Sequence, residues 1–121
     1  MNLYLASAYY RKGFLLEQAD KLVRLGHIIL SQWLYAEEET SEESKQQWAS
    51  QDCWDVNSCQ VFILDANEKC RASLVELGIA IKSHAHIIII GELDNLFSYY
   101  PGVHHLQNWD ELPKLLRELE K

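Results

Sequence analysis

The chain has 121 residues, of which 48% are hydrophobic and 24% are charged, with five glycines and two prolines. This composition is typical of a single globular domain, here residues 1–121, and excludes a disordered, collagen-like or low-complexity chain. Eleven basic against 18 acidic residues give a formal net charge of −7. This balance argues against a nucleic-acid polymer as partner, because such binding rests on many lysine and arginine contacts to phosphates. A small neutral or phosphorylated ligand remains compatible with it.

The cysteines and the apolar runs indicate the compartment. Cys53, Cys59 and Cys70 are an odd number without a C-x-x-C pair, so they cannot all form disulfides within one chain. Free cysteines are most often small buried hydrophobic residues. The start of the chain lacks a basic region, and the longest apolar run, at 87–90, is far below the ~20 residues that cross a bilayer. We expect a reduced, cytoplasmic protein that does not bind a membrane.

The first half of the chain alternates between apolar runs and helical periodicity. Residues 3–6 are predicted as a strand and 7–13 as a polar, aromatic loop, before a helix that starts near Phe14. Gly26 stands where a glycine ends a helix, and 27–30 is a second apolar run. The acidic segment 36–43 has no apolar periodicity, so we expect a solvated loop, with a lid over the ligand as the alternative.

The second half repeats this alternation. A continuous apolar run at 86–90 is typical of a parallel strand covered on both faces. The other predicted elements are a helix from Ser44 to about Asn57, a strand at 60–64, a turn at 65–68, a helix at 73–81, a short apolar run at 103–106, and a last helix after Asp110 with Leu112, Leu115, Leu116 and Leu119 on one face.

Five β-type runs alternating with four helices predict an α/β fold: an open parallel sheet with helices on both faces. In such folds the ligand binds beyond the carboxyl ends of the strands, where the strand order reverses, commonly between the first and third strands. This rule selects two loops, 7–13 and 65–72, as the candidate binding site. Glu76 lies about one turn into the helix that the second loop opens.

Glu76 is the first candidate for chemistry. A carboxylate near a helix N-terminus is favoured as an anion by the helix dipole, and a carboxylate can attack an anomeric carbon to give a covalent glycosyl intermediate. The alternative is a surface glutamate that only complements the dipole. The apolar or small neighbours Val75, Leu77 and Gly78 predict that the carboxylate is enclosed.

Asp52 and Asp55 form a second candidate group, because a spacing of three residues places both on one helical face. One carboxylate could act as nucleophile while another donates a proton to a departing base; the alternative is a solvated helix face. Flat apolar surface for a nucleobase is offered by four aromatic residues, which could equally be core or rim: Trp48, Trp54, Tyr9 and Tyr10.

Cations and amides occur in the loops that follow the strands. Arg11, Lys12 and Arg71 could meet a phosphate or serve surface solubility, and Asn95 follows the fourth apolar run, where it could also be a turn residue. No metal site is expected, because no cysteine or carboxylate stands at structural-zinc spacing from the histidines. These are His84, His86, His104 and His105.

Five segments together resemble the nucleoside 2-deoxyribosyltransferase family, including its deoxynucleotide N-hydrolase branch. The likeness covers nearly the whole chain and rests on the order and spacing of the segments, since no single motif decides it. They are 3–9 (LYLASAY), 51–55 (QDCWD), 75–80 (VELGIA), 91–97 (GELDNLF) and 101–103 (PGV).

The resemblance implies a flavodoxin-like fold and cleavage of the N-glycosidic bond of a 2-deoxynucleoside or its 5′-monophosphate, without metal or redox cofactor. Glu76 matches the family's catalytic glutamate and Asp52 the aspartate that contacts or protonates the base. Tyr4, or a residue of 7–10, corresponds to the segment that shapes the pocket. Asn95 matches the residue that a neighbouring subunit lends to the site, which implies a homodimer or larger homo-oligomer.

The loops depart from the hydrolase branch, whose small glycine-rich turns cradle a 5′-phosphate through backbone N–H groups. Here side chains replace most glycines, so side-chain donors would have to serve a phosphate instead: Ser7, Arg11, Arg71 and Ser73. The complete set of expected substrate-binding residues is Tyr4, Ser7, Tyr9, Arg11, Asp55, Arg71, Ser73 and Asn95. The alternative function is a nucleoside- or nucleotide-binding or sensing module without turnover on the same fold.

Overall fold

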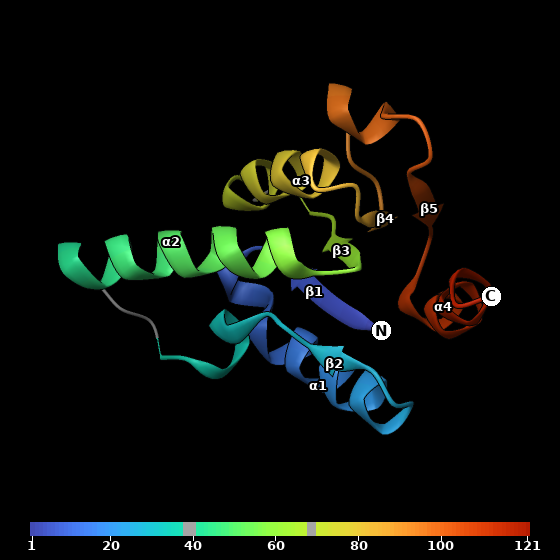
Figure 1. Ribbon diagram of the computed structural model, residues 1–121, viewed down its shortest axis with the longest axis horizontal. Coiled ribbons are helices and arrows are strands. Elements are labelled where there is room, and N and C mark those ends of the chain that lie inside the picture. The colour runs from blue at the N-terminus through green and yellow to red at the C-terminus, as the bar shows by residue number, and fades with distance from the viewer. Residues whose placement is uncertain (38–40, 68–69) are drawn as a thin grey trace.

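A computed structural model describes residues 1–37, 41–67 and 70–121. Within these residues, five strands form one sheet and four α-helices pack on it (Figure 1). The strands are β1 (Asn2–Ala6), β2 (Ile28–Ile29), β3 (Val61–Asp65), β4 (His86–Ile90) and β5 (His104–Leu106). The α-helices are α1 (Lys12–Arg24), α2 (Glu42–Ser58), α3 (Ala72–Lys82) and α4 (Leu112–Leu119), and short 3-10 helices are η1 (Tyr9–Arg11), η2 (Gln32–Tyr35), η3 (Leu96–Tyr99) and η4 (Trp109–Glu111).

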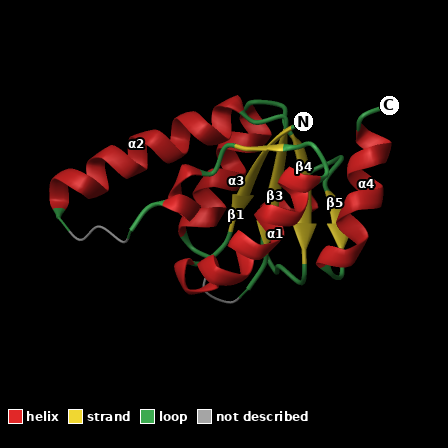
Figure 2. Cartoon of the chain, turned by 90° about the horizontal axis from the view of Figure 1, so that it is seen from below, coloured by secondary structure: helices red, strands yellow, loops and turns green. Residues whose placement is uncertain are grey.

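The strands are all parallel and follow the order β2-β1-β3-β4-β5. Their carboxyl ends therefore lie along one edge of the sheet, at the arrowheads in Figure 2. This is the flavodoxin-like order, in which the chain reverses direction across the sheet between β1 and β3. The predicted fold class, an open parallel α/β sheet of five strands, is confirmed.

Helices cover both faces of the sheet: α1 and α4 lie on one side, α2 and α3 on the other (Figure 1). Successive side chains of a strand point to opposite faces. Leu3 and Leu5 of β1 accordingly pack in the core beneath α1 and α4, whereas Tyr4 and Ala6 pack in the core beneath α2 and α3. This alternation places the Tyr4 side chain on the same side of the sheet as α3, which carries Glu76.

Several element boundaries differ from the sequence prediction by one or two residues, and two of these differences have a clear physical cause. The second strand comprises only Ile28–Ile29 of the expected 27–30, since it lies at the sheet edge and pairs with β1 alone. The acidic loop expected at 36–43 ends earlier, because Ser41 caps α2 by accepting a hydrogen bond from the Ser44 backbone and two acidic residues occupy the first helical turn, where the dipole favours them. Residues 38–40 of the proposed lid lie outside the described part.

The chain turn after α1 follows the prediction. Gly26 comes directly after Leu25, the C-cap residue, and has a φ of 97°, a left-handed conformation that glycine adopts without steric cost. The Gly26 N–H donates to the carbonyl of Val23 at 2.9 Å, which satisfies one of the last carbonyls of the helix. The turn directs the chain into β2 beside β1.

Candidate active site

A cavity of about 660 Å³ opens at the carboxyl ends of β1 and β3, between α2 and the start of α3. It lies where the reversal of strand order leaves a crevice. Figure 2 shows the first part of α2 reaching beyond the sheet, and Lys45 and Trp48 from this part belong to the cavity wall. The other lining side chains used below come from the β1 loop (Ser7, Tyr9, Tyr10), from η2 (Trp33), from α2 (Asp52) and from α3 and the residue before it (Arg71, Ser73, Glu76).

Glu76 provides a carboxyl group in the cavity wall, and the buried Tyr4 hydroxyl donates a hydrogen bond to its Oε2. Burial raises the pKa of Glu76 to about 8; the Tyr4 hydrogen bond opposes this rise and the nearby Asp52 adds to it. Burial also raises the pKa of Tyr4, so this phenol stays protonated and keeps donating. Desolvation therefore opposes the preference for an anionic Glu76 that the helix dipole was expected to give.

Asp52 comes from α2 and also lines the cavity. Its Oδ1 is buried without a hydrogen-bond partner among the described residues. Burial raises the pKa of Asp52 to about 6, and the charge of Asp55 raises it further. Two carboxyl groups with raised pKa values therefore share the cavity, an arrangement that suits one group to give a proton while the other acts as an anion.

Aromatic side chains form another wall of the cavity. The Trp33 Nε1 donates to the carbonyl of Leu5 at 2.9 Å, and the ring of Tyr9 lies with its centroid 6.5 Å from that of Trp33. The Lys12 ammonium group lies 5.3 Å from the Tyr9 ring centroid and donates to the carbonyl of Ala36. These contacts hold flat apolar surface at the cavity, as a planar heterocycle requires for stacking.

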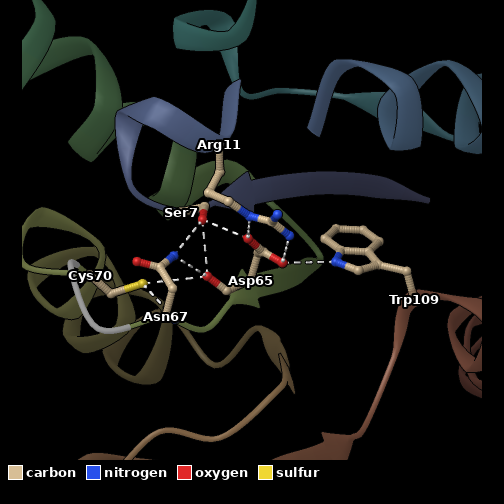
Figure 3. Close-up of polar contacts among 6 residues, drawn as sticks. All are labelled: Ser7, Arg11, Asp65, Asn67, Cys70 and Trp109. Atoms are coloured by element: carbon tan, nitrogen blue, oxygen red, sulfur yellow. Dashed lines mark hydrogen bonds and ion pairs between the residues drawn. The ribbon is translucent and has the colours of Figure 1, made fainter. Parts of the chain in front are cut away.

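A polar cluster around Asp65 supports the loop that follows β1 (Figure 3). The Asp65 carboxylate is 4% exposed and accepts from Arg11 Nε at 2.9 Å, from Arg11 Nη2 at 3.2 Å, from Ser7 Oγ at 2.8 Å and from Trp109 Nε1 at 2.9 Å. The Asn67 side chain donates to Ser7 Oγ at 3.0 Å. This cluster joins the loop after β1 to β3 and to η4, so it fixes one rim of the cavity.

Solved structures share this architecture. The 2-deoxyribosyltransferase of Bacillus psychrosaccharolyticus aligns with a TM-score of 0.73 over 93% of this chain and 90% of its own, at 19% identity. The chain has the 2-deoxyribosyltransferase fold. The CMP N-glycosidase of Clostridium botulinum aligns with a TM-score of 0.62 over 99% of this chain and 98% of its own, at 17% identity. No protein-family model and no curated protein sequence matches the chain.

The 2-deoxyribosyltransferase fold brings most of the expected site residues to one cavity, although they come from distant parts of the chain. Tyr4 lies behind the wall and contacts the cavity group Glu76 through its hydroxyl. Asp55 is buried next to the wall and is not part of the lining. The expected residues that line the cavity are Ser7, Tyr9, Asp52, Arg71, Ser73 and Glu76.

Arg11 and Asn95 lie elsewhere. Both hydrogen bonds of the Arg11 guanidinium go to Asp65, which holds the pKa of Arg11 above its usual value, and its carbon Cζ lies 4.2 Å from the ring centroid of Phe14. This ion pair replaces the expected contact to a ligand. Asn95 caps η3 by accepting a hydrogen bond from the Phe97 N–H at 2.9 Å, and it does not line this cavity.

Sequence reasoning missed Trp33 and Lys45. The strand-order rule selected only the loops after β1 and β3, yet Trp33 follows β2, whose carboxyl end lies at the same sheet edge. Lys45 lies on the part of α2 that extends past the sheet, and no local sequence pattern predicts this extension. Trp54, expected as a base-stacking candidate beside Trp48, is 69% exposed and lies outside the cavity lining.

Neither a metal site nor a membrane-spanning helix occurs within the described residues. Residues 1–37, 41–67 and 70–121 contain no group of three or more histidine, cysteine, aspartate or glutamate side chains placed to hold a metal ion. In the same part of the chain, every helix is too short or too polar to cross a bilayer.

Proposed function

We propose that the chain is an enzyme of the nucleoside 2-deoxyribosyltransferase type, which cleaves the N-glycosidic bond of a 2-deoxynucleoside or its 5′-monophosphate and passes the deoxyribosyl group to another base or to water. The observation that carries the proposal is the pair of carboxyl groups, Glu76 and Asp52, in one cavity. The shared fold with a 2-deoxyribosyltransferase and a CMP N-glycosidase supports the same class of reaction.

The reaction proceeds in two steps. The Glu76 carboxylate attacks the anomeric carbon, a C–O bond forms as the C–N bond breaks, and the electron pair of that bond leaves with the base. Asp52 gives its proton to the departing base, which neutralises it. In the second step a free base or a water attacks the anomeric carbon, Glu76 leaves as a carboxylate, and Asp52 takes up the proton. Neither step requires a metal or a redox cofactor.

The cavity wall offers partners for the rest of the substrate. Trp33, Trp48 and Tyr9 present flat apolar faces on which a nucleobase stacks. Ser73 and Arg71 lie at the start of α3, where backbone N–H groups and the helix dipole also favour an anion. We assign a 5′-phosphate, where the substrate carries one, to this end of the cavity, because the Arg11 guanidinium is already paired with Asp65.

Asn95 fits the proposal as a residue that acts in a second copy of the chain. It opens η3, which carries exposed apolar side chains: Leu96, Phe97 and Tyr99. Exposed apolar groups of this kind are typical of a surface that another protein covers. We therefore propose a homodimer or larger homo-oligomer, working in the cytoplasm, in which Asn95 of one copy approaches the cavity of another.

Product analysis by chromatography tests the function. The purified protein is incubated with the four deoxynucleosides, their 5′-monophosphates and CMP, with and without a second free base. Free base released without an acceptor establishes hydrolysis, and a new nucleoside that appears only with the second base establishes transfer.

The matched variants are Glu76→Gln and Glu17→Gln. Glu76→Gln keeps the shape and removes the nucleophile, so we expect product formation to fall by about 10³-fold or more. Glu17→Gln makes the same change at an exposed position of α1 and should keep full activity. If the unmodified protein releases nothing from any substrate, the covalent mechanism is wrong for them, and binding without turnover becomes the better explanation.

A further inference from the structure

Four acidic groups gather on the α2 and α3 side of the sheet, and within residues 1–37, 41–67 and 70–121 no salt bridge pairs any of them with a cation. They are the carboxyl groups of Asp52, Asp55 and Glu76 and the phenol of Tyr4, and Asp52 and Asp55 each contribute to the raised pKa of Tyr4. The salt bridges found within the described residues involve other side chains. Like charges in a desolvated cluster cannot all ionise near neutral pH, so at least one proton must remain on it.

Asp55 is the most deeply buried carboxyl group of this cluster, at 5% exposed. Its Oδ1 accepts from Gln51 Nε2 at 2.8 Å and from Gln32 Nε2 at 3.2 Å. These two hydrogen bonds fix the orientation of the Asp55 carboxyl group. Its Oδ2 is buried without a hydrogen-bond partner among the described residues. Because Asp55 does not line the cavity, its charge acts on its neighbours and not on a ligand.

Asp52 precedes Asp55 by three residues in α2, so the two lie on one face of the helix. Asp52 does line the cavity, and its Oδ1 is likewise buried without a partner among the described residues. An ionised Asp52 would place a second charge beside Asp55 and leave two buried oxygens without donors. A proton on Asp52 removes the repulsion and turns one of its oxygens into a donor.

We propose that Asp55 is a positioning residue whose buried charge favours the protonated form of Asp52, so that a larger fraction of Asp52 meets the substrate as an acid. The proposal rests on the proposed function only for its kinetic consequence, since the proton on Asp52 can be observed without turnover. Asp55 is therefore not the substrate contact that was expected from the sequence, and it acts through Asp52 in α2.

The other charged and titratable groups around Asp52 are consistent with this role. Glu76 faces it from α3 and Tyr4 from β1, and both disfavour a negative charge on Asp52 when they are ionised. Among the described residues, the remaining ones that line the same cavity are Tyr9, Tyr10, Glu37, Lys45 and Arg71. Burial is the largest cause of the raised Asp52 pKa, and Asp55 is the neighbouring charge that adds to it.

The direct test is a ¹³C NMR titration of the aspartate carboxyl carbons, with the Asp52 signal assigned by its loss in Asp52→Asn. In the unmodified protein we expect Asp52 to titrate near 6. In Asp55→Asn, which keeps the size and the hydrogen bonds to Oδ1, the Asp52 pKa should fall by about half a unit or more toward its ordinary value. Asp55→Ser removes the same charge with a smaller side chain and serves where the first variant does not fold.

The control is Asp110→Asn, which removes one negative charge at an exposed position of η4. It should leave the Asp52 titration and the activity unchanged. An Asp52 pKa that does not move in either Asp55 variant overturns the proposal, whether or not the protein has activity. Absence of turnover in the product analysis overturns the proposed function alone.

The pH profile of kcat/KM gives a second readout. If Glu76 reacts as the anion and Asp52 as the acid, the active form is a small fraction of the protein at every pH, and this fraction is largest between the pKa values of about 6 and about 8. Asp55→Asn should move the lower limb down and reduce kcat/KM between the limbs by about threefold for each half unit, while activity well below the limb stays unchanged. An equal loss at every pH would mean that Asp55 has only a structural role.

Discussion

Asp65 and Asp55 are buried to the same degree, at 4% and 5% exposed, yet their surroundings differ. Asp65 has a guanidinium, a hydroxyl and an indole N–H on its two oxygens, so its charge is compensated. Asp55 has two neutral amides on one oxygen and no donor on the other among the described residues, and Asp52 is a second acid beside it. Burial alone therefore does not separate the acids around the cavity from a structural one; the lack of a paired cation among the described residues does.

The strongest test of this comparison is to remove the charge of Asp65, which Arg11 compensates. Asp65→Asn leaves the Arg11 guanidinium without its ion pair, and the free energy of unfolding should fall by about 2–4 kcal/mol, a range set by the one-third exposure of Arg11. Urea denaturation measures the loss. KM should rise because the Ser7 loop loosens, while the limbs of the pH profile stay near 6 and 8. Limbs that move would show that Asp65 belongs to the reactive cluster.

Removing a carboxyl group that has no paired cation should instead raise the free energy of unfolding. The pKa of Glu76 is about 8 in the folded protein and near 4.5 in the unfolded chain, so the folded state holds the extra proton and stability falls as the pH rises from about 4.5 to about 8. The Glu76→Gln variant has no titrating carboxyl group at this position, so it does not lose stability in this pH range. Above pH 8 it should unfold with a free energy about 1–3 kcal/mol higher than the unmodified protein.

Thermal unfolding of both proteins at pH 5 and pH 9 measures this difference. The two melting temperatures should lie close together at pH 5 and separate at pH 9. Glu17→Gln again supplies the exposed control. Parallel curves for Glu76→Gln and the unmodified protein across this range would contradict the raised pKa.

The hydrogen bond from Tyr4 allows a finer test. Tyr4→Phe keeps the ring stacked on Phe62, whose centroid lies 5.9 Å away, but removes the donor to Glu76. Because that hydrogen bond lowers the pKa of Glu76, its loss should raise the upper limb of kcat/KM above 8 and reduce activity at pH 7 by about three- to tenfold. A limb that stays in place would mean that Tyr4 only packs.

The smallest expected effect concerns the link from Asp65 to η4. Trp109→Phe removes the indole N–H at Asp65 while an aromatic ring remains to pack edge-on against Phe14. The free energy of unfolding should fall by about 1–2 kcal/mol, and both limbs of the pH profile should stay in place. A change in the pH profile would show that the cluster around Asp65 is coupled to the cluster of Asp52 and Glu76.

The sheet could be predicted because its strands are locally encoded. The run at 86–90 reads as a fully covered strand from composition alone, and β4 occupies the same residues with four of them buried. The strand-order rule then selected the correct sheet edge, and with it Glu76. The length of β2 was overestimated. Its position at the sheet edge limits its pairing, and an edge position cannot be recognised from the apolar run itself.

The roles of the polar residues were harder to predict. Arg11 was expected at a ligand, and Asp65 was treated as the start of a turn, because their ion pair joins residues 54 positions apart. The dipole argument for an anionic Glu76 was incomplete for a related reason, because it considers only the helix that carries the residue. Enclosure by β1 and α2 is what raises the pKa.

The sequence by itself determined the alternation of strands and helices and the edge of the sheet at which the cavity and Glu76 lie, because periodicity and strand order act through local geometry. The resemblance to the 2-deoxyribosyltransferase family added Asp52. Only the tertiary structure decided which acids are compensated by a cation and which share a desolvated cluster. The free energy of a buried charge depends on all neighbours within a few ångströms, and in this fold those neighbours come from β1, η2, α2 and α3.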